Sequence, residues 1–445
     1  MKQIGEINSA DRLFFPDEIV FCRHPEGWLV VAVPTANWLL LPNDFQRSLI
    51  DHLIKGETIG EVFQLITDEN QLADFKRLLA AITARDFART DHAPEPQATD
   101  VTHQLTLYLT NACNLRCQHC FMRSGKPLDN ELPKEEWQRI LSEFCEFDGE
   151  SVTFTGGEPL MNPDFKDILT YAHDLDLNTT ILSNGILWTD NLIRQLSPYI
   201  SEIQISIDGF DESSNAKVRG AGHFDRIVQN VILFANAGVR TSVATTFTLQ
   251  NLQSDAAERY QQMVQHINSQ CPTPVFFKLS KKILQGRNTH YTEEQNRIFY
   301  DRIMEIERMV NPEAQFTNFM VAHTPNSITR NCGFGGISIG ADGEVYFCNR
   351  LSELESYGNI RSKSIKTFME LGSRLHVHTS VDNLQPCADC HLRYICCGGC
   401  RIEECNFQGR LQHHVGPLLQ VKCSTDTISK LEQKMIDSYL HHYQF

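Results

Sequence analysis

The first part of the chain alternates short apolar runs with polar, glycine or proline breaks. The runs EIVFCRH, GWLVVAV and WLLLP predict three short strands. NDFQRSLIDHLIKG then repeats apolar residues at helical spacing and stops at Gly56. Thr58 and Glu61 form a capping box at the start of a second helix, and residues 69–88 supply a third. Residues 1–88 are therefore predicted to be a small unit of three strands followed by three helices.

The pattern changes after residue 88. RTDHAPEPQATD is polar and carries Pro94 and Pro96, which predicts a linker over residues 89–103. From residue 104 strand-like runs alternate with helical stretches, and the strand candidates are residues 104–110, 151–155, 178–182, 202–207, 240–246 and 275–280. This alternation predicts parallel strands with crossover helices, so we expect a partial (β/α)6, TIM-like barrel over residues 104–310. Ligand chemistry in such folds gathers at the carboxyl ends of the strands.

The alternation fades after about residue 325. ISIGADGEVYFC predicts a hairpin with Asp342 and Gly343 at its turn. A cysteine-rich segment and a final helix, TDTISKLEQKMIDSYLHHY, complete the chain. We expect residues 325–445 to form a separate C-terminal domain.

Composition narrows the range of partners. The 445 residues are 41% hydrophobic and 21% charged, and their net charge is −15. Such an acidic chain is not expected to bind nucleic acid or an anionic membrane surface. The start MKQIGEINSADRLFFPDE lacks a basic region followed by an apolar core, and no apolar run approaches the roughly 18 residues of a membrane span. We therefore expect a cytoplasmic protein.

Fifteen cysteines are unusual for such a chain. Without an export signal, clustered cysteines favour metal binding or redox chemistry over disulfides. Most of them fall in two groups, within residues 113–120 and 332–423. The others, and one that does not fit the spacing of the second group, are interpreted as packed thiols: Cys22, Cys145, Cys271 and Cys397.

The first group lies on one loop directly after the first barrel strand. Cys113, Cys117 and Cys120 have the spacing C-x3-C-x2-C. Structural zinc is usually closed by four ligands, whereas a four-iron cluster on three thiolates keeps one iron free to bind something else. The sequence thus predicts an open iron–sulfur site, and a zinc site with a remote fourth ligand is the alternative.

Polar and glycine residues follow the next strands. FTGGEPL ends the second strand, where two glycines allow a close backbone approach and Glu158 offers a carboxylate to an ammonium group. The other candidates at these strand ends are Ser183, Ser206, Asp208 and Arg219. Because parallel strands end at one mouth, these side chains are expected to surround one site.

Over residues 104–310 this constellation resembles the radical S-adenosylmethionine (SAM) enzymes. The resemblance implies that Cys113, Cys117 and Cys120 hold a [4Fe–4S] cluster whose open iron chelates SAM. It also implies that one-electron reduction of SAM gives a 5′-deoxyadenosyl radical, which takes a hydrogen from an unactivated carbon. The residues that it assigns to SAM are His119, Gly156, Gly157, Glu158, Ser183, Ser206, Asp208 and Arg219.

The second cysteine group flanks and follows the predicted hairpin. Its spacing is C-x10-G-x4-C followed by C-x2-C-x5-C-x3-C, and a zinc ribbon is the alternative for such spacing in isolation. Behind a radical SAM barrel the pattern resembles the SPASM extension, which carries auxiliary [4Fe–4S] clusters. The resemblance implies two of them, hence three clusters in all, and an electron donor such as flavodoxin or ferredoxin.

The ligands follow from that resemblance. One auxiliary cluster is assigned to Cys387, Cys390, Cys396 and Cys423, with Cys405 as the alternative to Cys423. The other is assigned to Cys332, Cys348 and Cys400. The family often has a further cysteine six residues before the first, and this chain has Asn326 there. The fourth ligand of that cluster is therefore unassigned.

The N-terminal unit bears on the substrate. Its order of strands and helices resembles the winged-helix domain that recognises the leader of a precursor peptide, which such domains bind as an added strand. An unrelated interaction or dimerisation module is the alternative. We therefore expect a maturase that abstracts a hydrogen from a short, ribosomally made precursor peptide and installs a side-chain crosslink, of carbon–carbon, ether or thioether type.

Other activities stay open. A sulfatase-maturing type would oxidise a Ser or Cys in a protein partner, but that group has an aspartate base after the second SPASM cysteine. This chain has Asn349 there, and an amide cannot take the proton. A simple electron carrier would not need Glu158, Asp208 and Arg219 at the barrel mouth. Epimerisation and desaturation of a peptide begin with the same hydrogen abstraction as crosslinking.

Overall fold

The computed structural model describes residues 8–98, 104–283, 286–351, 354–405 and 419–443. Its chain divides into two compact units, which are described separately. The first unit takes residues 1–100, 313–334 and 376–445, and the barrel unit takes residues 101–312 and 335–375. Both units are thus built from segments that are discontinuous in sequence, whereas the predicted domain ranges are continuous.

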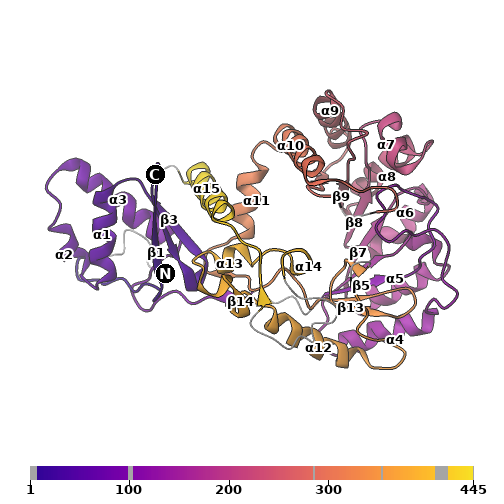
Figure 1. The fold of residues 1–445 in the computed structure, drawn as a ribbon, viewed down its shortest axis with the longest axis horizontal. Coiled ribbons are helices and arrows are strands. Elements are labelled where there is room, and N and C mark those ends of the chain that lie inside the picture. Colours follow the sequence, from indigo (N-terminus) through magenta and orange to yellow (C-terminus); the bar gives the residue numbers. More distant parts are fainter. Residues whose placement is uncertain (1–7, 99–103, 284–285, 352–353, 406–418, 444–445) are drawn as a thin grey trace. The chain divides into compact units, whose positions relative to one another are not determined.

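The first unit begins with the predicted strands and helices (Figure 1). Its antiparallel sheet has the order β1-β2-β3, formed by β1 (Ile19–His24), β2 (Gly27–Ala32) and β3 (Asn37–Leu41). Three helices follow, α1 (Asp44–Ile54), α2 (Ile59–Phe63) and α3 (Glu69–Ala84). The predicted capping box is present, since Thr58 Oγ1 accepts the Glu61 N–H and the Glu61 carboxylate accepts the Thr58 N–H.

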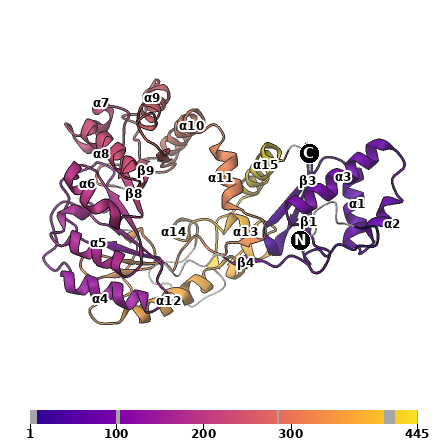
Figure 2. The same cartoon turned by 180° about the vertical axis from the view of Figure 1, so that it is seen from behind.

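The core of the first unit is shared by both ends of the chain. Trp38 on β3 is fully buried with Phe319, Ile395 and Met435, which come from much later segments. Among these segments α11 (Ala314–Ala322) and α15 (Thr425–His442) lie side by side (Figures 1 and 2). The remaining elements of this unit are β4 (Gln97–Ala98), β11 (Ser327–Ile328), β14 (Leu384–Gln385), α13 (Arg393–Cys396), α14 (Arg401–Glu404) and β15 (Leu419–Gln420).

The barrel unit contains the predicted parallel sheet. Its order is β10-β9-β8-β7-β6-β5-β12-β13. The six parallel strands are β5 (Gln104–Tyr108), β6 (Ser151–Thr155), β7 (Asn178–Ser183), β8 (Glu202–Ser206), β9 (Arg240–Thr245) and β10 (Phe276–Leu279). The α/β fold class and the order of its strands are therefore confirmed. The helices of this unit are α4 (Lys134–Cys145), α5 (Phe165–Asp174), α6 (Asp190–Leu196), α7 (Glu212–Arg219), α8 (Phe224–Asn236), α9 (Ala256–Asn268), α10 (Glu293–Val310) and α12 (Ile365–His378).

The predicted hairpin joins this sheet. Strand β12 (Ile337–Ile339) pairs in parallel with β5 and antiparallel with β13 (Val345–Tyr346). Gly343 lies in the turn with φ of 86°, a conformation that favours glycine. The hairpin therefore extends the sheet of the barrel past its first strand.

The period of two along the strands explains how this sheet creates a site. Leu105, Leu107, Val152 and Phe154 are buried, whereas their neighbours on the opposite face are largely polar or threonine. Those polar neighbours line a cavity: Gln104, Thr106, Thr153, Thr155, Thr180, Gln204 and Ser206. The sheet thus directs its apolar side chains to the helices and its polar side chains to one interior space.

No helix in the described part of the chain is both long enough and apolar enough to cross a membrane.

Candidate active site

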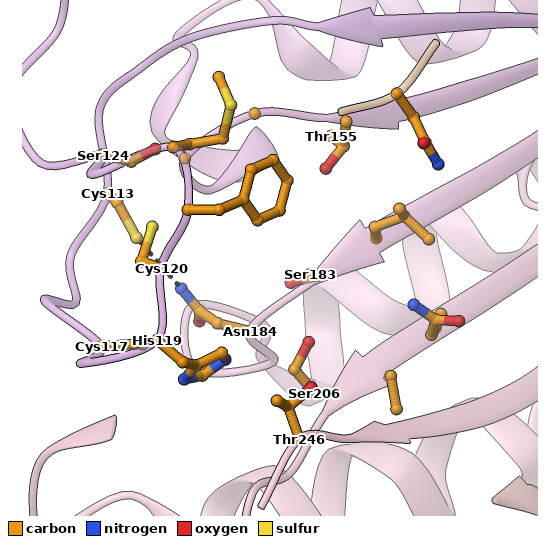
Figure 3. Close-up of a pocket in the computed structure, with 18 of the residues that line it drawn as sticks. Cys113, Cys117, His119, Cys120, Ser124, Thr155, Ser183, Asn184, Ser206 and Thr246 are labelled. Atoms are coloured by element: carbon orange, nitrogen blue, oxygen red, sulfur yellow. Dashed lines mark hydrogen bonds between the residues drawn. The ribbon is translucent and has the colours of Figure 1, made fainter. Parts of the chain in front are cut away.

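The cavity of the barrel unit has a volume of about 770 Å³. That size is within the range of small-molecule and cofactor sites. The thiols of Cys113, Cys117 and Cys120 line one side of it. Strand-end hydroxyl groups such as those of Ser206 and Thr246 lie across from the cysteine loop (Figure 3). The structure therefore brings the predicted cysteine loop and the predicted strand ends to one place.

The cysteine loop is held by backbone contacts that do not need a metal. The Cys113 N–H donates to the Gly125 carbonyl at 3.2 Å, which closes the loop at its base. The Cys113 sulfur accepts the Leu115 N–H at 3.4 Å and the side-chain amide of Asn184 at 3.9 Å. Such N–H donors favour a thiolate, the form in which cysteine binds metal.

Gly156 and Gly157 fit closely against this loop. A Cβ atom on Gly156 would lie 2.4 Å from the Thr110 carbonyl oxygen, and one on Gly157 would lie 2.1 Å from the Ala112 carbonyl oxygen. Gly156 also has φ of 138°, which larger residues rarely adopt. Both glycines line the cavity, yet their close neighbour within the protein is the cysteine loop. Sequence reasoning anticipated a close backbone approach but not that partner.

Glu158 is fully buried behind these glycines. Its carboxylate accepts the Ser183 hydroxyl and the Asn184 N–H, each at 2.8 Å. Burial raises the pKa of Glu158 to about 7, although these hydrogen bonds oppose the shift. Among the described residues Glu158 is not in the cavity wall, so its carboxylate positions the end of β7. Its contact with an ammonium group stays a prediction.

Asp208 is the centre of a buried charge network at the end of β8. Its Oδ2 atom accepts the Arg219 Nε–H at 2.6 Å and lies 3.3 Å from His119 Nε2. Its Oδ1 atom accepts the Thr246 N–H at 2.7 Å. The Asp208 side chain is only 1% exposed, so these partners compensate its charge. Asp208 therefore fixes Arg219 and His119 at the cavity.

His119 presents an unsatisfied atom to the site. Burial lowers the pKa of its imidazole, with smaller opposing and reinforcing contributions from Asp208 and Arg219. Its Nδ1 atom is buried without a hydrogen-bond partner among the described residues. Buried polar atoms of this kind are rare and call for a ligand or a water. Sequence reasoning placed His119 here for its backbone and missed both its pairing with Asp208 and its free Nδ1.

The last two barrel strands add groups that sequence reasoning did not name. Thr246 and Ser280 are joined by a hydroxyl hydrogen bond of 2.8 Å at the ends of β9 and β10. Lys278 and Lys282 add positive charge to the cavity wall. All four follow the rule of carboxyl-terminal strand ends, so the strand order alone would have found them. The other side of the wall includes Asn349.

The thiols of the loop need a metal to become anions. Burial raises the pKa of Cys113 and Cys117, and the neighbouring carboxylates Glu158 and Asp208 add to the shift. Without a bound cation these groups would stay protonated near neutral pH. Three thiols with N–H donors, beside the free Nδ1 of His119, fit a cluster with an open position and a polar ligand next to it.

The C-terminal thiols of the first unit form two neighbourhoods. The pKa of Cys387 is raised to about 12, first by burial and then by the charges of Cys396, Cys390 and Cys423. The pKa of Cys405 is raised to about 11, first by burial and then by Cys332 and Cys400. This grouping is compatible with the predicted preference for Cys423 in the set of Cys387. Cys348 belongs to the barrel unit, whereas Cys332 and Cys400 belong to the first unit.

Comparison with known proteins identifies the barrel. A family model described as the radical SAM superfamily matches residues 107–259, which contain the cysteine loop and the ends of the first four barrel strands. The chain is a radical SAM protein. Proteins of this superfamily use SAM and a [4Fe–4S] cluster, and the donor set of this cavity fits both.

Three curated relatives share parts of the radical SAM chain. The sporulation killing factor maturation protein SkfB of Bacillus subtilis is 32% identical over 41% of this chain and 43% of its own length. The AdoMet-dependent heme synthase of Nitratidesulfovibrio vulgaris is 27% identical over 68% of this chain and 88% of its own. The mycofactocin maturase MftC of Mycolicibacterium smegmatis is 28% identical over 66% and 77%. The match to SkfB thus spans less than half of that relative.

A solved structure supports the fold. The crystallised protein anSMEcpe with bound AdoMet superposes with a TM-score of 0.54 at 15% identity, over 76% of this chain and 93% of its own. At this identity the likeness concerns the fold alone. It agrees with a radical SAM barrel that extends into further segments, as expected from the sequence.

Proposed function

We propose that this radical SAM enzyme is a maturase that acts on a ribosomally made precursor peptide. The observation that carries the proposal is the single cavity in which three loop thiols face the polar ends of the barrel strands. Bound there, the cluster and SAM supply one-electron chemistry that removes a hydrogen from an unactivated carbon. The proposed cluster ligands are Cys113, Cys117 and Cys120.

The other cavity residues position the cofactor and exclude water in this proposal. Arg219, held by Asp208, supplies a fixed positive charge for a carboxylate. Ser206 supplies a hydroxyl for a ribose, and the free Nδ1 of His119 supplies a further polar contact. Gly156 and Gly157 keep the end of β6 close to the cysteine loop. A fixed geometry matters because a reactive species must meet only its target carbon.

A peptide substrate is supported by the first unit and by the names of the relatives. In its sheet β1 is an outer strand, which pairs only with β2 among the described residues. An outer strand can accept a peptide as an added strand, as leader-recognition domains do. Two of the relatives are named as maturation proteins. We propose that residues 1–88 bind the leader of the precursor.

Crosslinking is the proposed outcome of the reaction. The auxiliary clusters are proposed on Cys387, Cys390, Cys396 and Cys423, and on Cys332, Cys348 and Cys400. They would receive the surplus electron when a new bond forms, and a flavodoxin or ferredoxin would supply the initial one. Asn349 lies in the cavity wall, at the position where sulfatase-maturing enzymes carry their base. An amide there cannot take a proton, which favours a peptide crosslink over that oxidation.

A tetrapyrrole substrate is the second candidate. The relative named as a heme synthase aligns over 68% of this chain, more than either relative named as a maturation protein. The same hydrogen abstraction would then act on a side chain of the ring. This candidate gives the three-stranded sheet of the first unit no role in substrate recognition.

Mass spectrometry distinguishes these functions. The enzyme is co-expressed anaerobically with each short reading frame beside its gene, and a Cys120→Ser enzyme is the matched control. A loss of two hydrogens per site in one peptide, with fragmentation blocked between two residues, is expected with the native enzyme only. An unchanged mass with deuterium uptake from heavy water would indicate epimerisation. SAM cleavage with every peptide unchanged would overturn the peptide proposal and direct attention to tetrapyrroles and protein partners.

A further inference from the structure

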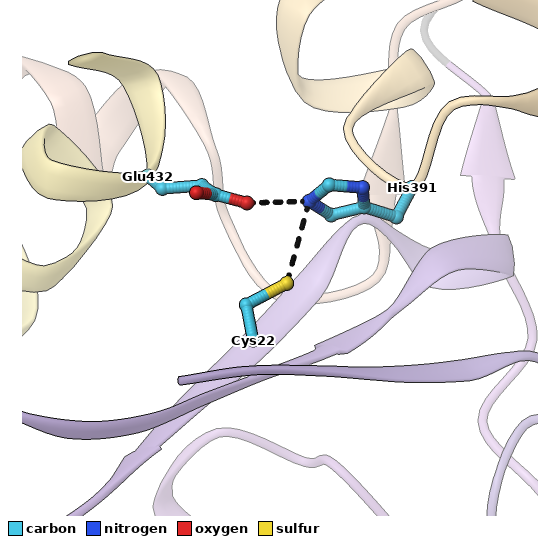
Figure 4. A group of neighbouring side chains, drawn as sticks. All are labelled: Cys22, His391 and Glu432. Atoms are coloured by element: carbon cyan, nitrogen blue, oxygen red, sulfur yellow. Dashed lines mark hydrogen bonds and ion pairs between the residues drawn. The ribbon is translucent and has the colours of Figure 1, made fainter. Parts of the chain in front are cut away.

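A group of three metal-ligating side chains lies in the first unit, apart from the predicted cluster ligands in its chemistry. It consists of Cys22 on β1, His391 just before α13 and Glu432 on α15. One ligand atom from each lies within 4.8 Å of the other two. Figure 4 shows the three side chains pointing toward one another from three different segments. Residues so remote in sequence meet here only because the chain ends share one core.

The distances show how these atoms converge. The Cys22 sulfur lies 3.7 Å from His391 Nε2, and the same Nε2 lies 2.8 Å from Glu432 Oε1. In a nucleophilic Cys-His-Glu triad the two ring nitrogens would face different partners, one the thiol and the other the carboxylate. Here a single nitrogen faces both. The arrangement therefore does not suit a triad, but it points sulfur, nitrogen and oxygen at a common centre.

The surroundings hold the carboxylate in place. The second oxygen of Glu432, Oε2, lies 3.3 Å from His24 Nε2, and His24 is on the same face of β1 as Cys22. The side chains of Glu432, His24 and His391 are only 10%, 14% and 20% exposed. A neighbour that orients the second oxygen of a carboxylate is typical of the outer shell of metal sites.

We propose that Cys22, His391 and Glu432 bind one divalent metal ion of the zinc class. Thiolate, imidazole and carboxylate are the three ligand types that zinc prefers, and it takes them in tetrahedral geometry. With bonds of about 2.0–2.3 Å, neighbouring tetrahedral donors lie roughly 3.3–3.7 Å apart. The Cys22–His391 distance of 3.7 Å already fits, and the His391–Glu432 contact of 2.8 Å needs to open slightly. A water takes the fourth position.

Such an ion would fasten the outer strand of the N-terminal sheet to the C-terminal helix. The ligands are separated by 369 residues between Cys22 and His391 and by 41 between His391 and Glu432. A link that closes so long a loop stabilises the folded state by restricting the unfolded chain. In the metal-free protein burial, then Glu432, raises the pKa of Cys22 to about 12, so the thiol is neutral until a cation displaces its proton.

The test uses the full-length enzyme with its iron–sulfur clusters assembled under anaerobic conditions. Zinc and iron are counted in the native protein and in Cys22→Ser and Glu432→Gln variants, after treatment with zinc and gel filtration. Cys145→Ser and Cys271→Ser are the matched controls, because both thiols are half-buried and stand alone. We expect about one zinc per chain in the native protein and the controls, and at least a tenfold weaker retention in both site variants. Iron content should be equal in all five proteins.

Cobalt makes the result independent of folding. In the native protein bound Co²⁺ should give a thiolate-to-cobalt absorption band, which Cys22→Ser loses and Cys145→Ser keeps. X-ray absorption at the zinc edge should show one sulfur with nitrogen and oxygen neighbours. Equal zinc retention in the native and Cys22→Ser proteins would overturn the proposal. A zinc shell of sulfur alone would also overturn it, since that ion would occupy a cluster site.

Discussion

The two cysteine regions of the molecule are built in opposite ways. In the barrel, Cys113 lies on a loop that is closed by a backbone hydrogen bond and fitted against Gly156 and Gly157. The C-terminal thiols lie on short irregular pieces, such as the single turns α13 and α14. Cys396 and Cys423 are exposed there. The barrel therefore forms its cysteine loop through the sheet, whereas the C-terminal region has little secondary structure to hold its thiols.

Backbone conformation supports this contrast. Cys397, Gly398 and Gly399 have positive φ angles of 58°, 70° and 70° in succession. Three consecutive left-handed residues form a tight bend that brings Cys396 and Cys400 toward separate neighbours, and the non-glycine residue carries a conformational cost. Metal binding stabilises such segments in small metal-bound domains. The comparison teaches that one cysteine pattern is positioned by the fold, while the other positions the fold around its metal.

The largest effect is expected from a single thiol in each region. Cys117→Ser should reduce SAM cleavage to background, because the loop then holds too few thiolates for its cluster. Cys396→Ser should keep measurable cleavage but lose the modified product. Chromatographic measurement of 5′-deoxyadenosine separates the two. SAM cleavage by Cys117→Ser at the native rate would contradict the assignment of the reactive site to the barrel loop.

Removal of iron should affect the two regions unequally. After chelation, hydrogen exchange should accelerate at least about tenfold in residues 384–404 and change little in residues 104–125, because only the latter are held by the sheet. The measurement is peptide-resolved exchange of the native and iron-free proteins. Similar acceleration in both regions would show that the barrel loop also depends on its metal.

A smaller effect is expected at the buried charge of the barrel. Asp208→Asn should lower the free energy of unfolding by about 3–5 kcal/mol, because it leaves the Arg219 guanidinium buried without its carboxylate. Urea titration of the iron-free protein gives this value. Asp167→Asn is the control, since that carboxylate is 60% exposed and its pair with Lys134 should contribute less than about 1 kcal/mol. Equal losses in both variants would remove Asp208 from its central position.

The smallest effect is a dependence on pH. The pKa of Glu158 is raised from 4.5 to about 7, so the folded state favours the protonated carboxyl group. Its stabilising contribution is complete below pH 4.5 and is lost as the pH rises to about 7. Relative to Glu158→Gln, the native free energy of unfolding should therefore fall by about 3 kcal/mol over this interval. A constant difference between the two proteins would contradict the burial of an ionisable Glu158.

Sequence patterns predicted the framework because the framework repeats. Alternating strands and helices predicted the six parallel strands, with ends within about two residues of those observed. The capping box of Thr58 and Glu61 was likewise visible, since it depends on local spacing. The spacing of Cys113, Cys117 and Cys120 predicted one loop, and the strand ends predicted Asp208 and Arg219 beside it.

The remainder depends on contacts between distant segments. Nothing local in the sequence indicates that Gly157 packs on Ala112, or that Glu158 supports Ser183 instead of lining the cavity. The interpretation of Cys22 as a packed thiol rested on its isolation in sequence. Its neighbours His391 and Glu432 are brought to it only by the shared core of the chain ends. Such pairings follow from the tertiary fold and have no periodic signal.

The central claim is that the barrel loop holds a cluster with one open iron, next to a site for SAM. Electron paramagnetic resonance of the reduced enzyme tests it most directly, in a Cys387→Ala/Cys390→Ala/Cys396→Ala variant that removes signals of the C-terminal region. The signal of the remaining barrel cluster should change when SAM is added and should disappear in a further Cys117→Ser variant. A signal that does not respond to SAM, or that survives Cys117→Ser, would contradict the claim.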